Sequence, residues 1–454
     1  TPENEHDNHG FIKDKLPDNL DFDDKDLTIL YWSDYTMTEF FVTIQSGEII
    51  NDSIFTRNQT VEERLGVKLN YVGEKAYEKS MGAYMQAAEK DIQSGANDYS
   101  IYASYSKTIP AMSLRGLLAD LMDIDYLDLD MPWWPKSLVE ECTINNILYF
   151  CSGDISTNML WMMIGTFFNI ELLEGYGLES PYDLVDANQW TIDKLIEMTR
   201  NVYADNDGNN RVNDGDMFGF IIYNENIDAF FTSAGIMAIE KDNNGNLIIS
   251  PTFNSERTID LISKIGDYIV YNPGVENSSS IYIRDNFFNQ NALMTMDRVF
   301  IVAGKDNRDY DTKIEFTYGL VPNAKYDPAD EYYTNLGHPF TLYAISSGAE
   351  DADMAGAVLE CLASESYRQV TPAVFETAMK IKYAHDEKTS QMYDIIRSTV
   401  VFDLGRLYGP TFQEYTSSVI RQQVIANSRS FSSMYRSFEK TILSGINKIM
   451  EAYS

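Results

Sequence analysis

One segment of the sequence places oxygen-bearing side chains at the spacing of a metal-binding loop. Residues 205–216 read DNDGNNRVNDGD. Calcium loops of twelve residues use side chains at positions 1, 3, 5, 9 and 12 and a backbone carbonyl at position 7. The corresponding residues are Asp205, Asp207, Asn209, Arg211 (through its carbonyl), Asn213 and Asp216. Because calcium prefers six to eight oxygen ligands, the spacing predicts a structural calcium site.

Two positions depart from the usual pattern of such loops. Asn210 stands where a glycine usually makes the sharp turn, and asparagine tolerates the left-handed conformation better than most residues. Asp216 stands where a glutamate usually coordinates calcium through both oxygens. The alternative is a solvated turn rich in Asn, Asp and Gly that binds no metal. No helix pair flanks the loop, so a bound ion would stabilise a loop and would not act as a sensor.

Strand and helix patterns alternate in the first half of the chain. This alternation predicts an α/β lobe with a mostly parallel sheet. Ligands of such sheets bind beyond the carboxyl ends of the strands, which here indicates Trp32–Tyr35 and Ser104–Lys107. The expected strands are Leu27–Trp32, Val67–Tyr71 and Tyr99–Tyr105, and the expected helices are Ile50–Leu65, Tyr77–Ser94 and Ile109–Leu118.

The middle of the chain interrupts this alternation. A polar segment, Ser152–Asn158, separates two apolar stretches that we interpret as strands, Ile147–Cys151 and Met159–Phe168. Such a polar break is typical of a crossing between two lobes. A helical pattern leads from Trp190 into the metal-binding segment, and from Asp351 onward the pattern is largely helical.

Composition excludes several classes of protein. The formal net charge of −34 over 454 residues repels nucleic acids and anionic lipid surfaces. No apolar run approaches the roughly 18 residues that a membrane-spanning helix requires. The three cysteines lack metal-ligand spacing, and four histidines supply little for a zinc or catalytic site.

Aromatic residues are frequent and suit the recognition of sugars. They make up 13% of the chain, with 30 Tyr and 5 Trp. Their rings offer flat apolar faces with a polar edge, which complement the C–H face and the hydroxyl groups of a sugar ring. A Tyr-rich core without a ligand remains the alternative.

Several segments occur in an order that resembles one known family. They are INDSIFTRNQTVEERL at Ile50–Leu65, the Trp133-Trp134 pair before Gly153-Asp154, FNIELLEGYGLESPYDLVDANQWTIDKL at Phe168–Leu195, and Tyr318–Pro322. The chain is similar to the extracellular solute-binding proteins of ABC importers, of the carbohydrate-binding family 1 type common in Gram-positive gut bacteria. The resemblance covers nearly everything from Leu16 to the C-terminus.

The resemblance implies an α/β, two-lobed, periplasmic-binding-protein-like fold of type II. Each lobe would hold a mostly parallel sheet flanked by helices, with three hinge crossings near Ser152–Ser156, Met294–Asp297 and Pro339–Tyr343. The expected division is a flexible tether over residues 1–26, an N-terminal lobe of 27–152 plus 297–340, and a C-terminal lobe of 153–296 plus 341–454.

The resemblance also implies a ligand between the lobes, which would close around it. We expect an oligosaccharide that the protein delivers to the permease subunits of the importer. For stacking we expect Trp32, Tyr35, Trp134, Trp161 and Tyr282, and for hydrogen bonding Asp34, Ser104, Asp154, Asn158, Asn224, Asp297 and Arg298. The sequence does not say which residue of the Trp133-Trp134 pair faces the ligand.

The family further implies a monomeric lipoprotein at the cell surface, with its signal peptide and anchoring cysteine trimmed. Such a protein needs no catalytic residues, and we expect no enzyme activity. The alternatives are a glycan-binding surface protein without transport, a binder of a solute other than sugar, and a glycoside hydrolase that acts through two carboxylates. With 69 Asp and Glu, carboxylate pairs occur by chance and do not favour the hydrolase.

Overall fold

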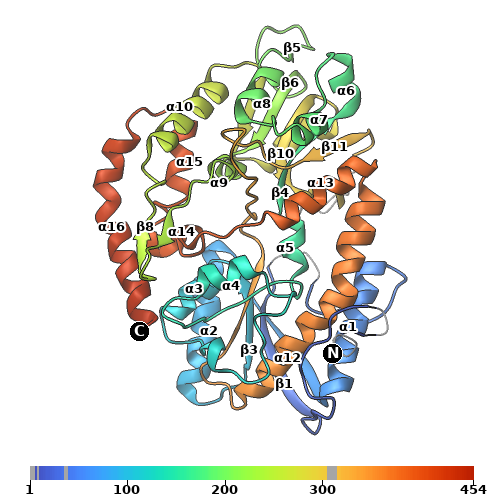
Figure 1. The fold of residues 1–454 in the computed structure, drawn as a ribbon, viewed down its shortest axis with the longest axis vertical. Coiled ribbons are helices and arrows are strands. Elements are labelled where there is room, and N and C mark those ends of the chain that lie inside the picture. Colours follow the sequence, from blue (N-terminus) through green and yellow to red (C-terminus); the bar gives the residue numbers. More distant parts are fainter. Residues whose placement is uncertain (1–5, 8–9, 35–38, 304–313) are drawn as a thin grey trace. The chain divides into compact units, whose positions relative to one another are not determined.

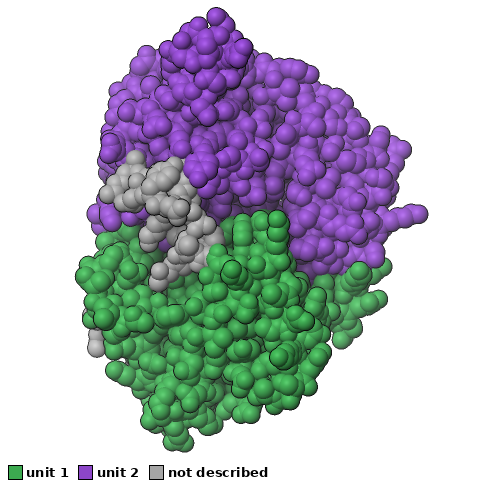
Figure 2. Space-filling model, turned by 180° about the vertical axis from the view of Figure 1, so that it is seen from behind, with its two compact units in different colours: residues 1–160, 338–378, 447–454 green, residues 161–337, 379–446 purple. Residues whose placement is uncertain are grey.

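The chain folds into two compact units. The computed structural model describes residues 6–7, 10–34, 39–303 and 314–454. Unit 1 comprises residues 1–160, 338–378 and 447–454, and unit 2 comprises 161–337 and 379–446 (Figure 2). The chain therefore passes from one unit to the other at residues 160–161, 337–338, 378–379 and 446–447.

This division differs from the lobes expected from the sequence. Residues 297–337 belong to unit 2, and 341–378 belong to unit 1. The reason is strand pairing: β10 (Ala292–Arg298) pairs with β4 and β6 of unit 2, whereas β12 (Thr341–Ile345) pairs with β3 of unit 1. The crossing expected at Met294–Asp297 is instead the interior of β10.

The sheet of unit 1 has the strand order β12-β3-β1-β2, and its strands β1 and β3 are labelled in Figure 1. Strand β1 (Lys25–Trp32) lies parallel to β2 (Val67–Glu74) and to β3 (Ile101–Tyr105). Only β12 runs antiparallel, against β3. The mostly parallel sheet predicted for the first half of the chain is thus present. The carboxyl ends of β1 and β3 lie beside the first residue of β12, Thr341.

The helices of unit 1 begin and end close to the expected residues. Gly66, at φ 57°, ends α1 (Ile49–Leu65) in the left-handed conformation that glycine readily adopts after a helix. The helix expected at Ile109–Leu118 is shorter. The other helices are α2 (Met81–Ser94), α3 (Thr108–Ser113), α4 (Lys136–Cys142), α5 (Thr157–Trp161) and α12 (Ala352–Glu365), with short turns at Glu78–Ser80, Leu121–Asp123 and the π-helix Ser366–Val370.

The sheet of unit 2 is mixed and has the order β11-β4-β10-β6-β5, with β9 also paired to β6. The pairs β10–β6 and β6–β9 are parallel, and the pairs of β4 with β10 and β11 and of β5 with β6 are antiparallel. The chain enters unit 2 at the edge where β10 ends, and β4 begins there. Strand β4 therefore runs antiparallel to β10, which makes this sheet less parallel than expected. The strands are β4 (Ile164–Asn169), β5 (Tyr203–Ala204), β6 (Met217–Tyr223), β9 (Val275–Ser278), β10 and β11 (Tyr318–Val321), and a separate hairpin joins β7 (Ile239–Lys241) to β8 (Leu247–Ile249).

The apolar stretch Met159–Phe168 was expected to be one strand and is two elements. Its first part completes α5, and only Ile164 onward forms β4. A continuous apolar run does not distinguish a buried helix from a buried strand.

Helices surround the sheet of unit 2 (Figure 1). Thr191 caps α8 through its hydroxyl, and Ser255 caps α10 in the same way. The helices are α6 (Ile170–Gly175), α7 (Pro181–Asp186), α8 (Ile192–Thr199), α9 (Asp228–Ser233), α10 (Glu256–Val270), α11 (Arg284–Phe288), α13 (Glu387–Ser398), α14 (Leu404–Leu407) and α15 (Ser418–Ile425), with 3-10 turns at Asn224–Ile227, Ile281–Ile283, Val299–Ala303 and Gly409–Phe412. Two further helices belong partly to each unit, the π-helix Pro372–Tyr383 and α16 (Phe431–Ala452).

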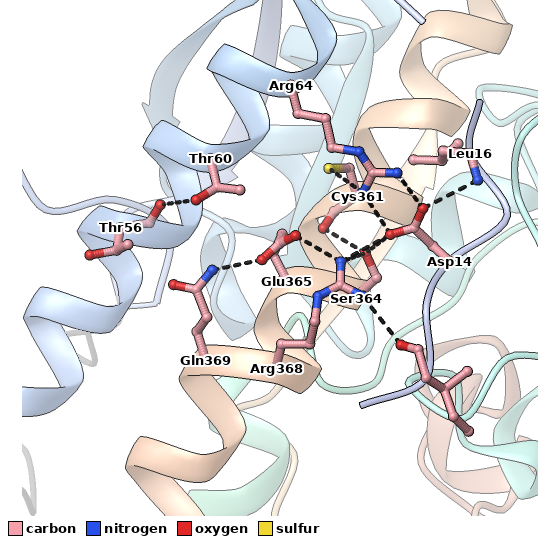
Figure 3. Close-up of polar contacts among 11 residues, drawn as sticks. Asp14, Leu16, Thr56, Thr60, Arg64, Cys361, Ser364, Glu365, Arg368 and Gln369 are labelled. Atoms are coloured by element: carbon pink, nitrogen blue, oxygen red, sulfur yellow. Dashed lines mark hydrogen bonds and ion pairs between the residues drawn. The ribbon is translucent and has the colours of Figure 1, made fainter. Parts of the chain in front are cut away.

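Part of the expected N-terminal tether is packed against unit 1. Asp14 accepts hydrogen bonds from Arg64 on α1 and from Arg368 and Ser364 on the α12 side, at 2.6–2.9 Å (Figure 3). Leu16 is 5% exposed. Before Asp14, the Phe11 ring lies 5.7 Å from that of Tyr367, and the Ile12 carbonyl accepts from Arg368 at 3.3 Å. The segment therefore contributes to the fold from Phe11 onward, which shortens the stretch that can act as a tether.

Candidate functional site

Aromatic rings gather at the carboxyl edge of the sheet in unit 1. Trp32 is the last residue of β1, and its indole nitrogen donates to the Thr341 hydroxyl at 2.9 Å. Its ring centroid lies 5.7 Å from that of Tyr105 and 6.5 Å from that of Tyr77. Tyr105 is the last residue of β3 and pairs with Thr341 in the ladder. Three rings from separate segments thus lie at the edge where the ligand rule for parallel sheets places a site.

A buried glutamate, Glu39, ties several segments of this edge together. Its carboxylate accepts from the Ser156 hydroxyl at 2.9 Å, from the Asn158 backbone N–H at 3.0 Å and from the Thr341 hydroxyl. Arg57 donates to the Glu39 carbonyl at 3.1 Å. Burial raises the pKa of Glu39, and the donated hydrogen bonds oppose that rise. The sequence analysis missed Glu39 because it lies in a segment without periodicity.

Asn158, one of the expected ligand residues, is oriented by this network. It is 1% exposed, and its backbone N–H is held by Glu39. Among the residues that the structure describes, its Oδ1 has no hydrogen-bond partner. The carboxylate of Asp154 accepts from the Thr371 hydroxyl at 2.8 Å, so this second expected residue is already engaged within unit 1.

Asp34 has a structural task that the sequence did not reveal. Its carboxylate accepts from the backbone N–H groups of Ala76 and Tyr77 at 3.0–3.1 Å. These bonds fix the loop that carries the Tyr77 ring beside Trp32. Tyr35, expected to stack on a ligand, lies outside the described residues.

Ser104 and the tryptophan pair lie inside unit 1. Ser104 is fully buried and faces the Tyr84 hydroxyl. The indole nitrogen of Trp134 donates to Glu360 on α12 at 3.0 Å, and Trp133 is 0% exposed. Both tryptophans of the pair therefore pack inward, whereas the sequence left open which of them does so.

In unit 2 the equivalent edge carries a buried ion pair. Strands β6 and β10 end there, and Arg298 at the end of β10 pairs with Ile164, the first residue of β4. Asp297 accepts from the Arg284 guanidinium at 2.9 Å and from the Asn226 amide at 3.0 Å. Burial opposes ionisation of Asp297, but Arg284 outweighs it and lowers the pKa of the carboxyl group.

Arg298 lies over aromatic faces at the same edge. Its guanidinium carbon is 5.8 Å from the ring centroid of Tyr223 and 5.3 Å from that of Phe300. A Cβ atom added at Gly337 would approach the Arg298 Cδ to 2.6 Å. The Arg298 side chain can therefore occupy this position only because residue 337 has no side chain.

The remaining expected residues of unit 2 differ in exposure. Asn224 accepts from the Asn277 amide at 2.8 Å at the end of β6. Tyr282 is 58% exposed, which leaves its ring accessible. Trp161 is 2% exposed, and its ring centroid lies 6.3 Å from that of Tyr383.

The predicted metal loop brings its carboxylates together. Oxygen atoms of Asp205, Asp207 and Asp216 all lie within 4.8 Å of one another. Asn210 has φ 58°, which is the left-handed conformation that a loop of this kind needs at that position. The Asn210 backbone N–H, followed by that of Gly208, lowers the pKa of Asp205. Hard oxygen donors in this arrangement fit a calcium ion.

The other residues of the loop complete its internal bonding. The Asn213 amide donates to the Arg211 carbonyl at 3.0 Å, and the Arg211 N–H donates to the Asn209 side chain at 2.7 Å. Asp216 is 1% exposed and accepts from the Tyr203 hydroxyl at 3.1 Å.

Each of the two α/β units has aromatic and polar side chains at the carboxyl edge of its sheet. This is the architecture of a two-lobed solute-binding protein. The sequence supports this conclusion independently. Residues 52–369 match the model of the family described as bacterial extracellular solute-binding protein. The chain belongs to this family of solute-binding proteins. A search of curated proteins finds no match.

Solved structures of this fold align over nearly the whole chain. The cyclic alpha-maltosyl-1,6-maltose binding protein from Arthrobacter globiformis has a TM-score of 0.61 at 14% identity, covering 93% of this chain and 98% of that one. The maltose-binding periplasmic protein from Listeria monocytogenes, in complex with maltose, has a TM-score of 0.56 at 14% identity and covers 95% and 100%. An ABC substrate-binding protein from Listeria monocytogenes, in complex with cycloalternan, has a TM-score of 0.55 at 12% identity and covers 94% and 99%. These likenesses establish the fold.

Within the ranges that the structure describes, no helix is long and apolar enough to span a membrane.

Proposed function

We propose that this protein captures an oligosaccharide and delivers it to the permease of an ABC importer. The observation that carries the proposal is the fold, which matches binding proteins crystallised with maltose and cycloalternan over 94–95% of this chain. Membership in the extracellular solute-binding family supports capture outside the cell.

The residues at the two sheet edges suit a sugar. Trp32 and its neighbouring rings offer apolar faces, and the free Oδ1 of Asn158 accepts from a hydroxyl group. Arg298, oriented over two aromatic rings, donates charge-assisted hydrogen bonds. We propose Trp32, Tyr35 and Asn158 in unit 1, and Trp161, Asn224, Tyr282 and Arg298 in unit 2, as ligand-binding residues of their units. Asp34 and Trp134 stabilise the fold through the contacts described above.

A binding experiment with a defined panel tests the proposal. Purified protein is titrated calorimetrically with glucose, maltose, maltotetraose, cyclodextrins and oligosaccharides of other linkages, and with mannitol as a control polyol. A ligand that binds only the folded state also raises the melting temperature. At a free ligand concentration of a hundred times Kd, it stabilises the folded state by about 2.7 kcal/mol. Binding of one oligosaccharide class without product formation on long incubation supports the proposal. Failure of every saccharide would contradict it, and slow cleavage would favour the glycoside hydrolase alternative.

We also propose that an N-terminal lipid anchors the protein to the outer face of the cell membrane. The anchor would keep the loaded protein near its permease. Metabolic labelling of the full-length protein with a radioactive fatty acid tests this. Label that is lost when the acylated cysteine is replaced supports the anchor, and unlabelled protein contradicts it.

Calcium at residues 205–216 is a further proposal. Three converging carboxylates and the left-handed Asn210 support it. Calcium chloride should raise the melting temperature of chelator-treated protein, and the double variant Asp205→Asn, Asp207→Asn should abolish the rise. Asp242→Asn is the matched control because Asp242 also organises an exposed turn, through Asn244 and Asn246. An unchanged melting temperature with calcium would show that the loop is a solvated turn.

A further inference from the structure

A buried side-chain amide in unit 2 makes no hydrogen bond to the part of the chain that the structure describes. Asn335 is 2% exposed, and neither its Oδ1 nor its Nδ2 has a partner among the residues that the structure describes. An asparagine side chain offers one acceptor and two donor hydrogens, and native proteins satisfy the large majority of such buried groups. An amide that is unsatisfied at both ends therefore requires an explanation.

The place of Asn335 is the carboxyl edge of the sheet in unit 2. Its carbonyl accepts from the backbone N–H of Ile164 at 3.2 Å. Ile164 begins β4 and pairs with Arg298, the last residue of β10. Gly337, two residues after Asn335, packs against the Arg298 side chain. Asn335 thus lies in the same short segment that positions Arg298.

The backbone around Asn335 is held on both sides. Thr334 exchanges backbone hydrogen bonds with Thr399 and Val401 at 2.8 and 2.9 Å. Leu336 accepts from Arg406 at 3.3 Å, and the Gly337 N–H donates to Met162 at 2.8 Å. The segment is fixed by its main chain, so the Asn335 side chain is not needed to hold it.

A second buried asparagine near Ile164 shows the contrast. Asn323 is 1% exposed, its Nδ2 donates to the Ile164 carbonyl at 3.0 Å, and its Oδ1 lies 3.4 Å from the Thr166 hydroxyl. Asn323 therefore has the structural task that a buried amide usually has, and Asn335 does not.

We infer that Asn335 is a solute-binding residue whose amide hydrogen-bonds hydroxyl groups of the ligand beside Arg298. A hydroxyl both donates and accepts, and so does a carboxamide, so one side chain can engage two neighbouring hydroxyls of a sugar ring. A rigid backbone with an unused amide is pre-organised for such a contact. This inference rests on the proposed function and names a residue of its site that the sequence analysis did not find.

The experiment compares Asn335→Leu and Asn335→Ala with Asn323→Leu. The first readout is the melting temperature without ligand. Asn335→Leu should melt within 1 °C of the wild type or above it, because no internal hydrogen bond is lost. Asn323→Leu should melt about 3 °C or more below the wild type, because it leaves the Ile164 carbonyl without its donor.

The second readout is the calorimetric Kd, with maltotetraose as the first probe and then the saccharide panel. Both Asn335 variants should bind about tenfold more weakly than the wild type, corresponding to about 1.4 kcal/mol. The alanine variant adds no bulk, so weaker binding in both variants reports the lost amide. Asn323→Leu, where folded, should keep the wild-type Kd.

The outcomes separate the inference from the proposed function. Wild-type protein that binds no saccharide contradicts the proposed function, and the inference then fails with it for sugars. Saccharide binding by the wild type with unchanged Kd in both Asn335 variants overturns the inference alone. A fall in the ligand-free melting temperature of Asn335→Leu equal to that of Asn323→Leu also overturns it, since the amide would then be structural through a buried water.

Discussion

Replacing Glu360 by glutamine should stabilise the protein increasingly as pH rises. Glu360 lies on α12, is 1% exposed, and accepts from the Trp134 indole at 3.0 Å and the Asp128 N–H at 3.3 Å. Its second carboxyl oxygen has no partner within the described part of the chain. Burial raises the pKa of Glu360 from 4.5 to about 8. The folded protein therefore holds a proton at neutral pH that the unfolded chain has released.

The sign and size of the effect follow from this pKa. Between pH 4.5 and about 8 the folded state binds more protons than the unfolded state, so stability falls as pH rises. Above the folded pKa the full difference, at 1.36 kcal/mol per pKa unit, corresponds to about 5 kcal/mol. Glutamine retains an oxygen for the Trp134 and Asp128 donors and has no charge to bury.

Urea denaturation at pH 5, 6, 7, 8 and 9 measures the effect. The unfolding free energy of Glu360→Gln minus that of the wild type should rise across this range by about 4 kcal/mol, because part of the full difference lies below pH 5. The control is Asp14→Asn. Burial opposes ionisation of Asp14, but its arginine partners lower its pKa from 3.8 to about 2. Its stabilisation is thus present above pH 4 and lost only in acid, so this variant should be less stable by a constant amount between pH 5 and 9. A flat difference for Glu360→Gln would refute the reasoning.

Three further substitutions test contacts inside single units. Arg421→Met should lower the unfolding free energy by about 3 kcal/mol, because it removes one of two arginines from the buried Asp228 carboxylate; an unchanged urea midpoint would contradict this. Glu39→Ala should cost about 3 kcal/mol by leaving buried donors unpaired, whereas Glu39→Gln should cost less, and equal losses would show that the acceptor oxygens are unimportant. Gly219→Ala should destabilise by about 1–3 kcal/mol, since its Cβ would lie 2.0 Å from a carbonyl oxygen at the end of α8; Gly175→Ala, with no atom within 4 Å of its Cβ, is the control, and similar melting temperatures would refute the clash.

The local elements were largely predictable from the sequence. The helix predicted at Ile50–Leu65 is α1, and the strand predicted at Val67–Tyr71 lies within β2. Thr191 and Ser255 cap helices that begin directly after them, so these caps also depend on neighbouring residues. These features depend only on residues close together in the chain, so a short stretch of sequence is enough to predict them.

The candidate site was less predictable, because the tasks of polar side chains depend on distant partners. Asp34 reads as an exposed strand-end carboxylate, yet it accepts from backbone groups about 40 residues later, at Ala76 and Tyr77. Asn335 and Asn323 are both asparagines, and only their surroundings show that the Asn323 amide is hydrogen-bonded whereas the Asn335 amide has no partner among the described residues.

The sequence by itself determined the alternation of strands and helices in the first half of the chain, the largely helical pattern after Asp351 and the family, because these follow from periodicity and the order of segments. It also determined the converging carboxylates of residues 205–216, since a twelve-residue loop is set by its own spacing. The tertiary structure alone decided which unit each late strand joins. Strand β12 pairs with β3, more than 200 residues earlier in the chain, and β10 pairs with β4. Such pairing depends on how all strands of the sheet pack together. A short stretch of sequence therefore cannot predict it.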